Sequence, residues 1–245
     1  MAEYKISITG DLGSGKSTVC KIISEKISAE VISIGSIQRA MAKEMGMTTY
    51  EFNRYMETHP EIDDKFDTML KSYDAVFGKN MLFDSRLAWN FVPSAFSVYL
   101  TVDLKEAGRR VFNANRENEG YSSAEEAEQK LKARRASEVL RYSAAYGVTL
   151  SDMFNYDIIV DSTTATPEEV AGAILSECER YARGEVHCGA YISPVRLNLT
   201  EHTKGDGEVT VYEVDGNYFV LTGGDAVLAA KNSGKTLVCC KLVRK

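Results

Sequence analysis

The sequence lacks the features by which membrane-spanning, secreted and nucleic-acid-coating proteins are recognised. No apolar run approaches the roughly 20 residues needed to cross a bilayer, and the first ten residues, MAEYKISITG, lack a charged leader followed by an apolar stretch. With 35 acidic and 29 basic residues, the chain has a formal charge of −6 and no general surplus of positive charge that would attract nucleic acid. We therefore expect a cytoplasmic protein that binds neither a membrane nor nucleic acid.

Cysteine is too scarce and too irregularly spaced for a metal or disulfide framework. The five cysteines form no C-x-x-C pair, which argues against a structural zinc site, and their odd number favours reduced thiols. We expect them to pack as small hydrophobic side chains: Cys20, Cys178, Cys188, Cys239 and Cys240.

The chain otherwise has an ordinary globular composition. Its 245 residues are 44% hydrophobic and 26% charged, which excludes extended disorder, collagen and coiled-coil arrays. Short apolar runs alternate with helical patterns, as expected for parallel strands that are buried on both faces and joined by helical crossovers. The predicted strands occupy residues 4–8, 31–34, 81–83, 96–102 and 156–160.

Three helix starts are indicated by side chains that can satisfy free backbone N–H groups. They are Thr48 with Glu51, Ser122 with Glu125, and Thr166 with Pro167 and Glu169. The second start opens a charged segment, residues 122–145, with little apolar periodicity. We expect a long helix there with at least one face that is solvated or functional.

The pattern changes after Tyr181. Glycines and a proline punctuate a linker, and two alternating segments then flank Asp215-Gly216, a pair that favours a two-residue hairpin turn. A helix over residues 226–232 and a strand over 237–243 complete a ββαβ unit. We therefore expect two domains, residues 1–183 and residues 190–245.

A phosphate-binding loop stands between the first predicted strand and the first helix. The segment Gly10-Asp11-Leu12-Gly13-Ser14-Gly15-Lys16-Ser17 matches G-x-x-x-x-G-K-[ST] in full. Such glycines let successive N–H groups point at a phosphate, and the following helix adds its positive N-terminal end. Lys16 is expected to hold the β and γ phosphates of ATP, and the Ser17 hydroxyl to bind Mg²⁺. The predicted ATP-binding residues are Gly10, Gly13, Ser14, Gly15, Lys16, Ser17 and Thr18.

Arginines at the ends of predicted elements distinguish this chain from a bare nucleotide switch. No N-K-x-D segment of the guanine-reading kind is present, whereas Asp84 and Arg86 follow a strand, at the edge where ligands of parallel sheets bind. Further arginines lie on helical segments and could neutralise several phosphates: Arg39, Arg109, Arg110, Arg116, Arg134, Arg135 and Arg141. This pattern favours transfer of a phosphoryl group between two phosphorylated molecules.

Over residues 3–180, the chain resembles the nucleoside monophosphate kinases, and most closely the short cytidylate kinases typical of archaea and some bacteria. Besides the loop, the resemblance rests on five segments: Ser33-Ile34-Gly35 followed by Arg39, Glu51-Phe52-Asn53, His59-Pro60-Glu61-Ile62-Asp63, Asp84-Ser85-Arg86-Leu87-Ala88-Trp89, and Arg134 through Tyr142 with Tyr146-Gly147. The resemblance implies a P-loop NTPase three-layer α/β fold, with a mainly parallel five-stranded sheet, a helical lid and a small α+β C-terminal domain added to it.

The same resemblance implies roles for individual residues. Arg39 and Arg86 would grip the acceptor monophosphate, and Asp84 would orient the acceptor or a magnesium-bound water. Arg116, Arg134 and Arg141 would be lid arginines that close over the transferring phosphoryl group. Glu138 would contact ribose or pair with an arginine, and Arg109 or Arg110 would lie against the donor adenine. The catalytic set is then Lys16, Asp84, Arg86, Arg116, Arg134 and Arg141.

The resulting expectation is ATP-dependent, Mg²⁺-requiring phosphorylation of CMP or dCMP by direct in-line transfer. Two alternatives stay open: a kinase for another small acceptor, and a catalytically silent ATP-binding regulatory protein. The C-terminal segment resembles the ParB/sulfiredoxin-like fold, but the His-Arg or Cys-Arg pair of that family is replaced by Gly224-Asp225. We therefore expect an accessory or protein-contact domain.

Overall fold

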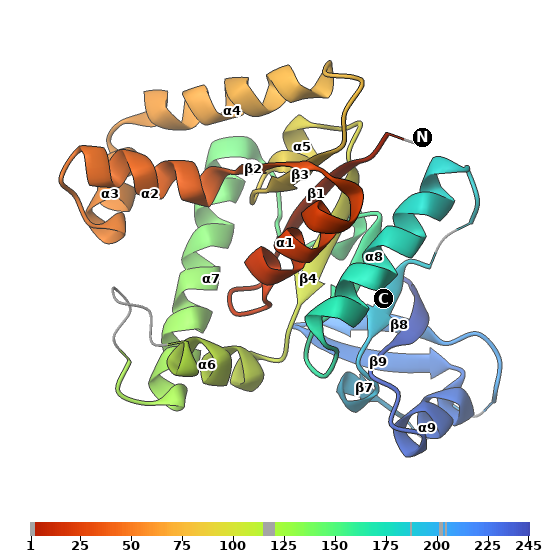
Figure 1. The fold of residues 1–245 in the computed structure, drawn as a ribbon. Coiled ribbons are helices and arrows are strands. Elements are labelled where there is room, and N and C mark those ends of the chain that lie inside the picture. Colours follow the sequence, from red (N-terminus) through yellow and green to blue (C-terminus); the bar gives the residue numbers. More distant parts are fainter. Residues whose placement is uncertain (1–2, 115–120, 187, 201–202, 204) are drawn as a thin grey trace.

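Five parallel strands form the centre of the protein, as the apolar runs predict. The computed structural model describes residues 3–114, 121–186, 188–200, 203 and 205–245. The strands lie side by side in the order β2-β3-β1-β4-β5 (Figure 1). Their bounds are β1 Lys5–Gly10, β2 Glu30–Ser33, β3 Met81–Asp84, β4 Phe96–Thr101 and β5 Ile158–Asp161. Because the chain leaves β1 where the strand order reverses, a ligand crevice is expected directly beyond its end.

Helices cover the sheet on both faces. Helices α1 and α8 pack against one face around Ile6, Ile8 and Ile174, and α4 and α5 contribute to a second core around Phe83 and Phe91. The helices are α1 Lys16–Ile27, α2 Ile34–Glu44, α3 Thr49–Glu57, α4 Pro60–Asp74, α5 Ala88–Phe91, α6 Leu104–Asn113, α7 Ala124–Tyr146 and α8 Pro167–Ala182, with a 3₁₀ turn, η1, at Met153–Asn155. The three-layer α/β fold is confirmed.

Two of the three predicted helix starts are correct. Thr48 begins α3 and Thr166 begins α8, each with a reciprocal capping box to the glutamate three residues on. The third is wrong by one residue, because Ser123 caps α7 by accepting from the N–H of Glu126. Ser122 instead donates its hydroxyl to the Glu126 carboxylate. Both serines can cap a helix, and the pattern alone does not choose between them.

The C-terminal segment continues the same sheet. Strand β6 (Ala190–Ile192) runs parallel to β5, and the described sheet then extends through β10, β8, β9 and β7 to ten strands. The predicted ββαβ unit is present as β8 Thr210–Val214, β9 Asn217–Thr222, α9 Gly224–Asn232 and β10 Val238–Leu242. The unpredicted elements are β6, the 3₁₀ turn η2 (Pro194–Arg196) and β7 (Leu197–Asn198). Asp215 and Gly216 both have positive φ, as the predicted hairpin turn requires.

One hydrophobic core is shared between the two parts of the chain. Tyr99, Tyr156 and Ile159 belong to the first part, and they pack in the same buried cluster as Val211 and Tyr218 of the second. Other members from the C-terminal segment are Ala190, Ile192, Leu197, Val209, Val220, Val227 and Cys240. The change of pattern after Tyr181 is therefore not a break in packing.

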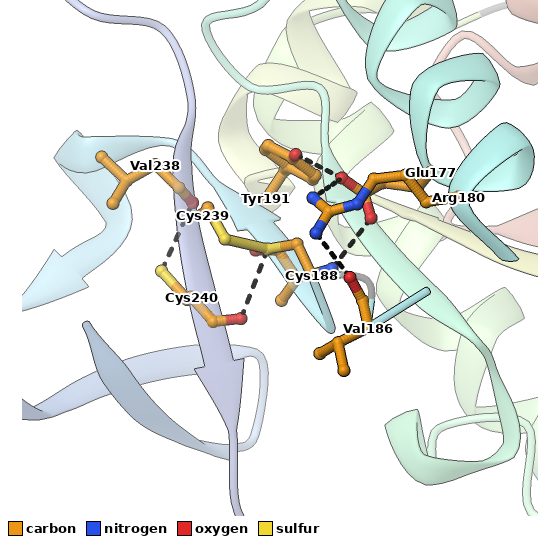
Figure 2. Close-up of a disulfide and its surroundings, with 9 residues drawn as sticks. Glu177, Arg180, Val186, Cys188, Tyr191, Val238, Cys239 and Cys240 are labelled. Carbon is orange, nitrogen blue, oxygen red and sulfur yellow. Dashed lines mark hydrogen bonds and ion pairs between the residues drawn. A yellow bond between two sulfur atoms is a disulfide. The ribbon is translucent and has the colours of Figure 1, made fainter. Parts of the chain in front are cut away.

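The prediction that all cysteines are reduced is wrong for one pair. Cys188 and Cys239 form a disulfide across 51 residues, with their Cα atoms 6.1 Å apart. Antiparallel pairing of β6 with β10 brings them together, and spacing along the sequence could not show this. Figure 2 shows the surroundings, where the buried Glu177 carboxylate accepts from the Cys188 N–H and the Tyr191 hydroxyl. Cys20, Cys178 and Cys240 are buried free thiols, as expected.

We predict that the disulfide stabilises the oxidised protein. Closing a loop of this length reduces the freedom of the unfolded chain, so Cys239→Ser should lower the free energy of unfolding by about 2–4 kcal/mol. Thermal unfolding with and without dithiothreitol measures this. Reductant should destabilise the parent protein and leave the Cys239→Ser protein unchanged; an equal effect on both would contradict the prediction.

Candidate active site

The phosphate loop has the backbone that an anion site needs. Gly13 and Gly15 have φ of 79° and 82°, which glycine adopts without strain. At Gly10 a Cβ would lie 2.1 Å from the Leu100 carbonyl oxygen, so only glycine lets the loop leave β1 beside β4. Helix α1 has no side-chain cap at Gly15. Its first N–H groups and its dipole are therefore available to a bound phosphate.

Lys16 lies over this loop. Its Nζ donates to the carbonyl oxygens of Gly10 and Asp11, at 3.2 and 3.1 Å. Burial is the largest cause that lowers the pKa of Lys16 to about 7, and the nearby positive charge of Arg86 contributes to the same shift. The hydrogen-bond acceptors of Lys16 among the described residues are carbonyl oxygens, and an anion placed there would favour the charged form of the lysine.

Arg86 brings the end of β3 to the same place. Its guanidinium donates to the Gly10 carbonyl oxygen and forms a 3.2 Å ion pair with Glu138 of α7. Asp84 accepts a 3.2 Å hydrogen bond from Ser33, and the indole of Trp89 donates to the Arg86 carbonyl at 3.0 Å. The two strand ends and the long helix therefore converge beside the loop.

Asp11 anchors the loop to its surroundings, and sequence reasoning did not single it out. Its buried carboxylate accepts from the Tyr99 hydroxyl at 2.7 Å, the Thr101 hydroxyl at 3.0 Å and the Val102 N–H at 3.2 Å. Arg135 of α7 adds a 2.8 Å ion pair. Burial and the Asp11 carboxylate raise the pKa of Tyr99 well above its ordinary value, so the hydroxyl stays protonated and donates.

These side chains surround a small cleft. Its cavity of about 20 Å³ is lined by the loop, by Arg86 and Tyr99, and by Arg135 and Glu138 of α7. A fully formed cationic cluster would repel itself. Glu138 offsets this by pairing with both Arg86 and Arg134, each at 3.2 Å. The contact of Glu138 with arginine is thus one of the two options that the resemblance implied.

The hairpin of α6 and α7 holds the remaining lid residues. The two helices approach closely at Gly108, where a Cβ would lie 2.8 Å from the Ala124 carbonyl oxygen. Arg109 points outward, with a side chain that is 60% exposed and paired with Glu106. Arg110 points inward and donates to the Ser162 carbonyl at 2.7 Å and to the Gly13 carbonyl at 3.5 Å. Arg110 is therefore the better placed of the two candidates for contact with a donor base.

The other predicted residues have separate local partners. Arg39 donates to the Ser36 hydroxyl at 2.9 Å on the exposed side of α2. Arg141 donates to the Tyr142 hydroxyl at 2.9 Å and lies within electrostatic range of Asp63. Arg116 lies outside the described residues. The structure thus gathers Lys16 and Arg86 at the loop, together with the Arg134–Glu138 pair.

A divalent cation at this site would need the loop itself. Within the described part of the chain, no group of three or more His, Cys, Asp or Glu side chains is placed to hold a metal ion. Ser17 is exposed in the first turn of α1, next to the uncapped N–H groups, and fits a cation that also binds phosphate oxygens.

No helix among the described residues is long and apolar enough to cross a membrane.

Known proteins match this chain in both sequence and fold. A model of the cytidylate kinase-like family matches residues 5–164. The cytidylate kinase of Thermoplasma volcanium is 39% identical over 187 residues, covering 75% of this chain and 95% of that protein. An S-adenosylmethionine-dependent nucleotide dehydratase of Lacinutrix mariniflava is 33% identical over 177 residues, covering 72% of this chain but 36% of that protein.

A solved structure supports the fold independently. The crystal structure of an uncharacterized protein from Eubacterium ventriosum superposes with a TM-score of 0.56, covering 72% of this chain and 99% of that chain at 16% identity. Such a likeness shows the fold alone, whereas the family match extends over the loop, the strand ends and the α6–α7 hairpin. The chain therefore belongs to the cytidylate kinase-like family and is a nucleotide-binding P-loop kinase.

Proposed function

We propose that this kinase transfers the γ-phosphoryl group of ATP to CMP or dCMP. The observation that carries the proposal is the meeting of Lys16, Arg86 and the Arg134–Glu138 pair at one phosphate loop. Several relatives are named cytidylate kinases, which supports cytosine as the acceptor base. The reaction needs no covalent enzyme intermediate, because in-line transfer depends on position and charge.

The donor would be held by the phosphate loop. The N–H groups of the loop and of the first turn of α1 would bind the β and γ phosphates, and Lys16 would exchange its carbonyl partners for phosphate oxygens. Ser17 would hold Mg²⁺, which bridges phosphate oxygens and offsets their charge. Arg110 would lie along the donor base, with the segment 162–163 opposite it; the prediction for Arg109 stands as the alternative.

The acceptor would be held by Arg86 and Arg39. Arg86 already lies beside the loop, and its guanidinium fork matches the oxygens of a monophosphate. On binding it would turn from Gly10 and Glu138 toward the acceptor. Asp84 would orient the acceptor from the end of β3. Ser85 is buried, and its hydroxyl accepts from the Leu87 N–H in the turn after β3.

The lid would complete the site. Arg134 and Arg141 lie on α7, and Arg116 belongs to the segment between α6 and α7; all three would close over the transferring phosphoryl group. Closure excludes water that would otherwise hydrolyse ATP. Glu138 would then release Arg86 and Arg134 to the phosphates, or contact the ribose of the acceptor.

We predict that CMP and dCMP are phosphorylated in preference to UMP, AMP and GMP. A coupled assay of ADP release, run with each monophosphate, measures this. Dependence of ADP release on another acceptor would favour the alternative kinase. Tight ATP binding without ADP release with any acceptor would favour a silent regulatory protein.

We predict that Lys16→Ala lowers turnover about 10³-fold or more, because it removes a charge that acts on the transferring phosphoryl group. The fold should persist, since Lys16 contacts loop carbonyls and not the core. Lys21→Ala, on an exposed turn of the same helix, is the matched control and should keep its activity. Loss of cooperative unfolding in Lys16→Ala would contradict this account.

We predict that ATP binding takes up a proton at Lys16. Because the pKa of Lys16 is about 7, roughly half a proton should be taken up at pH 7 once phosphate restores the charge, and affinity should fall as the pH rises above 7. Calorimetry in two buffers of different ionisation enthalpy measures this uptake. Lys16→Arg, which cannot lose its proton, is the control; equal uptake in both proteins would refute the assignment.

A further inference from the structure

We propose that Arg196, in the C-terminal segment, is a positioning residue for the phosphate loop. It acts through Thr101 on Asp11, so that the segment after α8 is part of the nucleotide-binding apparatus. The family match ends at residue 164, and Arg196 therefore lies outside the region that the family model describes. The proposal deepens the proposed kinase function and rests on it for the identity of the nucleotide.

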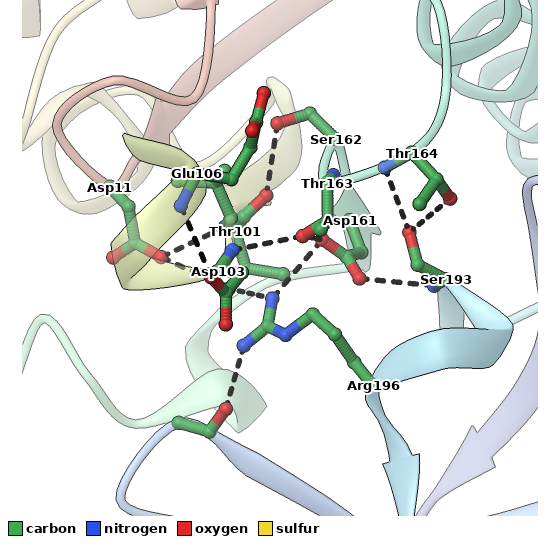
Figure 3. A network of polar contacts seen from close by, with 12 residues as sticks. Asp11, Thr101, Asp103, Glu106, Asp161, Ser162, Thr163, Thr164, Ser193 and Arg196 are labelled. Carbon is green, nitrogen blue, oxygen red and sulfur yellow. Dashed lines mark hydrogen bonds and ion pairs between the residues drawn. The ribbon is translucent and has the colours of Figure 1, made fainter. Parts of the chain in front are cut away.

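Arg196 is inserted between the ends of β4 and β5. Its side chain is 10% exposed, and Nη1 donates to the Thr101 hydroxyl and to the Asp161 carboxylate, each at 3.1 Å. Nη2 donates to the Gly216 carbonyl oxygen at 2.6 Å, and the guanidinium lies 5.1 Å from the centre of the Tyr218 ring. Figure 3 shows this guanidinium directed from the C-terminal segment into the strand ends.

The Thr101 hydroxyl links Arg196 to Asp11 of the phosphate loop. A threonine hydroxyl has one proton to donate. Since Thr101 accepts from Arg196, its oxygen is fixed by that contact and its proton is directed to Asp11 Oδ2 at 3.0 Å. We infer that the position of the Asp11 carboxylate depends on a cation that lies 95 residues beyond Thr101 in the chain.

Asp11 in turn shapes the phosphate site. Its carbonyl oxygen accepts from the Ser14 N–H, the Ser14 hydroxyl and Lys16 Nζ. Any rotation of Asp11 therefore displaces the acceptor that Ser14 and Lys16 share. Its carboxylate also receives Arg135 from the lid helix. A path of adjoining polar contacts thus runs from Gly216 through Arg196, Thr101 and Asp11 to α7.

A purely structural role for Arg196 is the competing explanation. The Asp161 carboxylate is fully buried, and Arg196 is the cation that neutralises it. Removing Arg196 altogether would leave that charge uncompensated and threaten folding, whatever its effect on the loop. The test must therefore break the contacts that link Arg196 through Thr101 to Asp11, called the relay below, and keep the Arg196–Asp161 ion pair.

Thr101→Val breaks the relay and keeps the ion pair. It removes the hydroxyl while retaining a side chain of similar size beside an intact Arg196–Asp161 pair. We expect the dissociation constant of ATP, measured by calorimetry, and the KM for ATP to rise about tenfold, with a smaller change in the KM for the monophosphate. Thr203→Val is the matched control. Thr203 is buried like Thr101, but it lies in the C-terminal segment. Its hydroxyl donates to the Thr200 carbonyl oxygen and not to the phosphate loop.

Arg196→Lys supplies the second measurement. Lysine keeps a positive charge for Asp161 but loses the fork that reaches Thr101 and Gly216 together. If the relay exists, Arg196→Lys weakens ATP binding in the parent protein and has little further effect in Thr101→Val. Additive effects, or an ATP affinity of Thr101→Val equal to that of Thr203→Val, would overturn the proposal. ATP binding is measured without an acceptor, so a failed kinase assay would not decide this test.

Discussion

The buried carboxylate of Asp11 is the contact on which the rest of the site depends. It stands at the first turn of the phosphate loop, and its four donors come from β4, from the turn after β4 and from the lid helix. A buried carboxylate is costly unless every lone pair is satisfied. That cost is offset when the loop, the strand ends and α7 occupy one arrangement, the arrangement in which Lys16 Nζ contacts the loop carbonyl oxygens.

The positive charges of the cleft are partly offset by a carboxylate of the protein itself. Arg86 and Arg134 share Glu138, while Lys16 is held by carbonyl oxygens and has a lowered pKa. A net acidic protein therefore keeps a cationic site without an unpaired cluster of charge. Phosphate oxygens are stronger partners than carbonyl groups and can replace Glu138. Under the proposed function, substrate binding would be an exchange of partners, which costs less than creating the charges anew.

Local patterns in the sequence predict what local chemistry decides. The phosphate loop, two capping boxes and the turn at Asp215-Gly216 all depend on a few neighbouring residues, and all were predicted. The Cys188–Cys239 bond, the pairing of β6 with β5 and the role of Asp11 depend on residues that meet only in the fold. The different orientations of Arg109 and Arg110 also depend on the fold. Neighbouring positions of a helix face different directions, and only the packing of α6 decides which of the two faces the phosphate loop. The reason for glycine at position 224 is visible only in the structure. A Cβ there would lie 1.9 Å from the Thr203 carbonyl oxygen, so the His or Cys of the ParB/sulfiredoxin-like pair would not fit.

The shared core joins the C-terminal segment to the part of the chain that carries the phosphate loop. Tyr99 packs in that core while its hydroxyl binds Asp11, so one side chain belongs both to the interface and to the loop anchor. Without the segment, Tyr99 and Ile159 would lose their covering side chains, and Asp161 would lose Arg196. The contrast in composition after Tyr181 therefore reflects a change from helical crossovers to short strands. The described residues on both sides of it contribute hydrophobic side chains to one buried cluster.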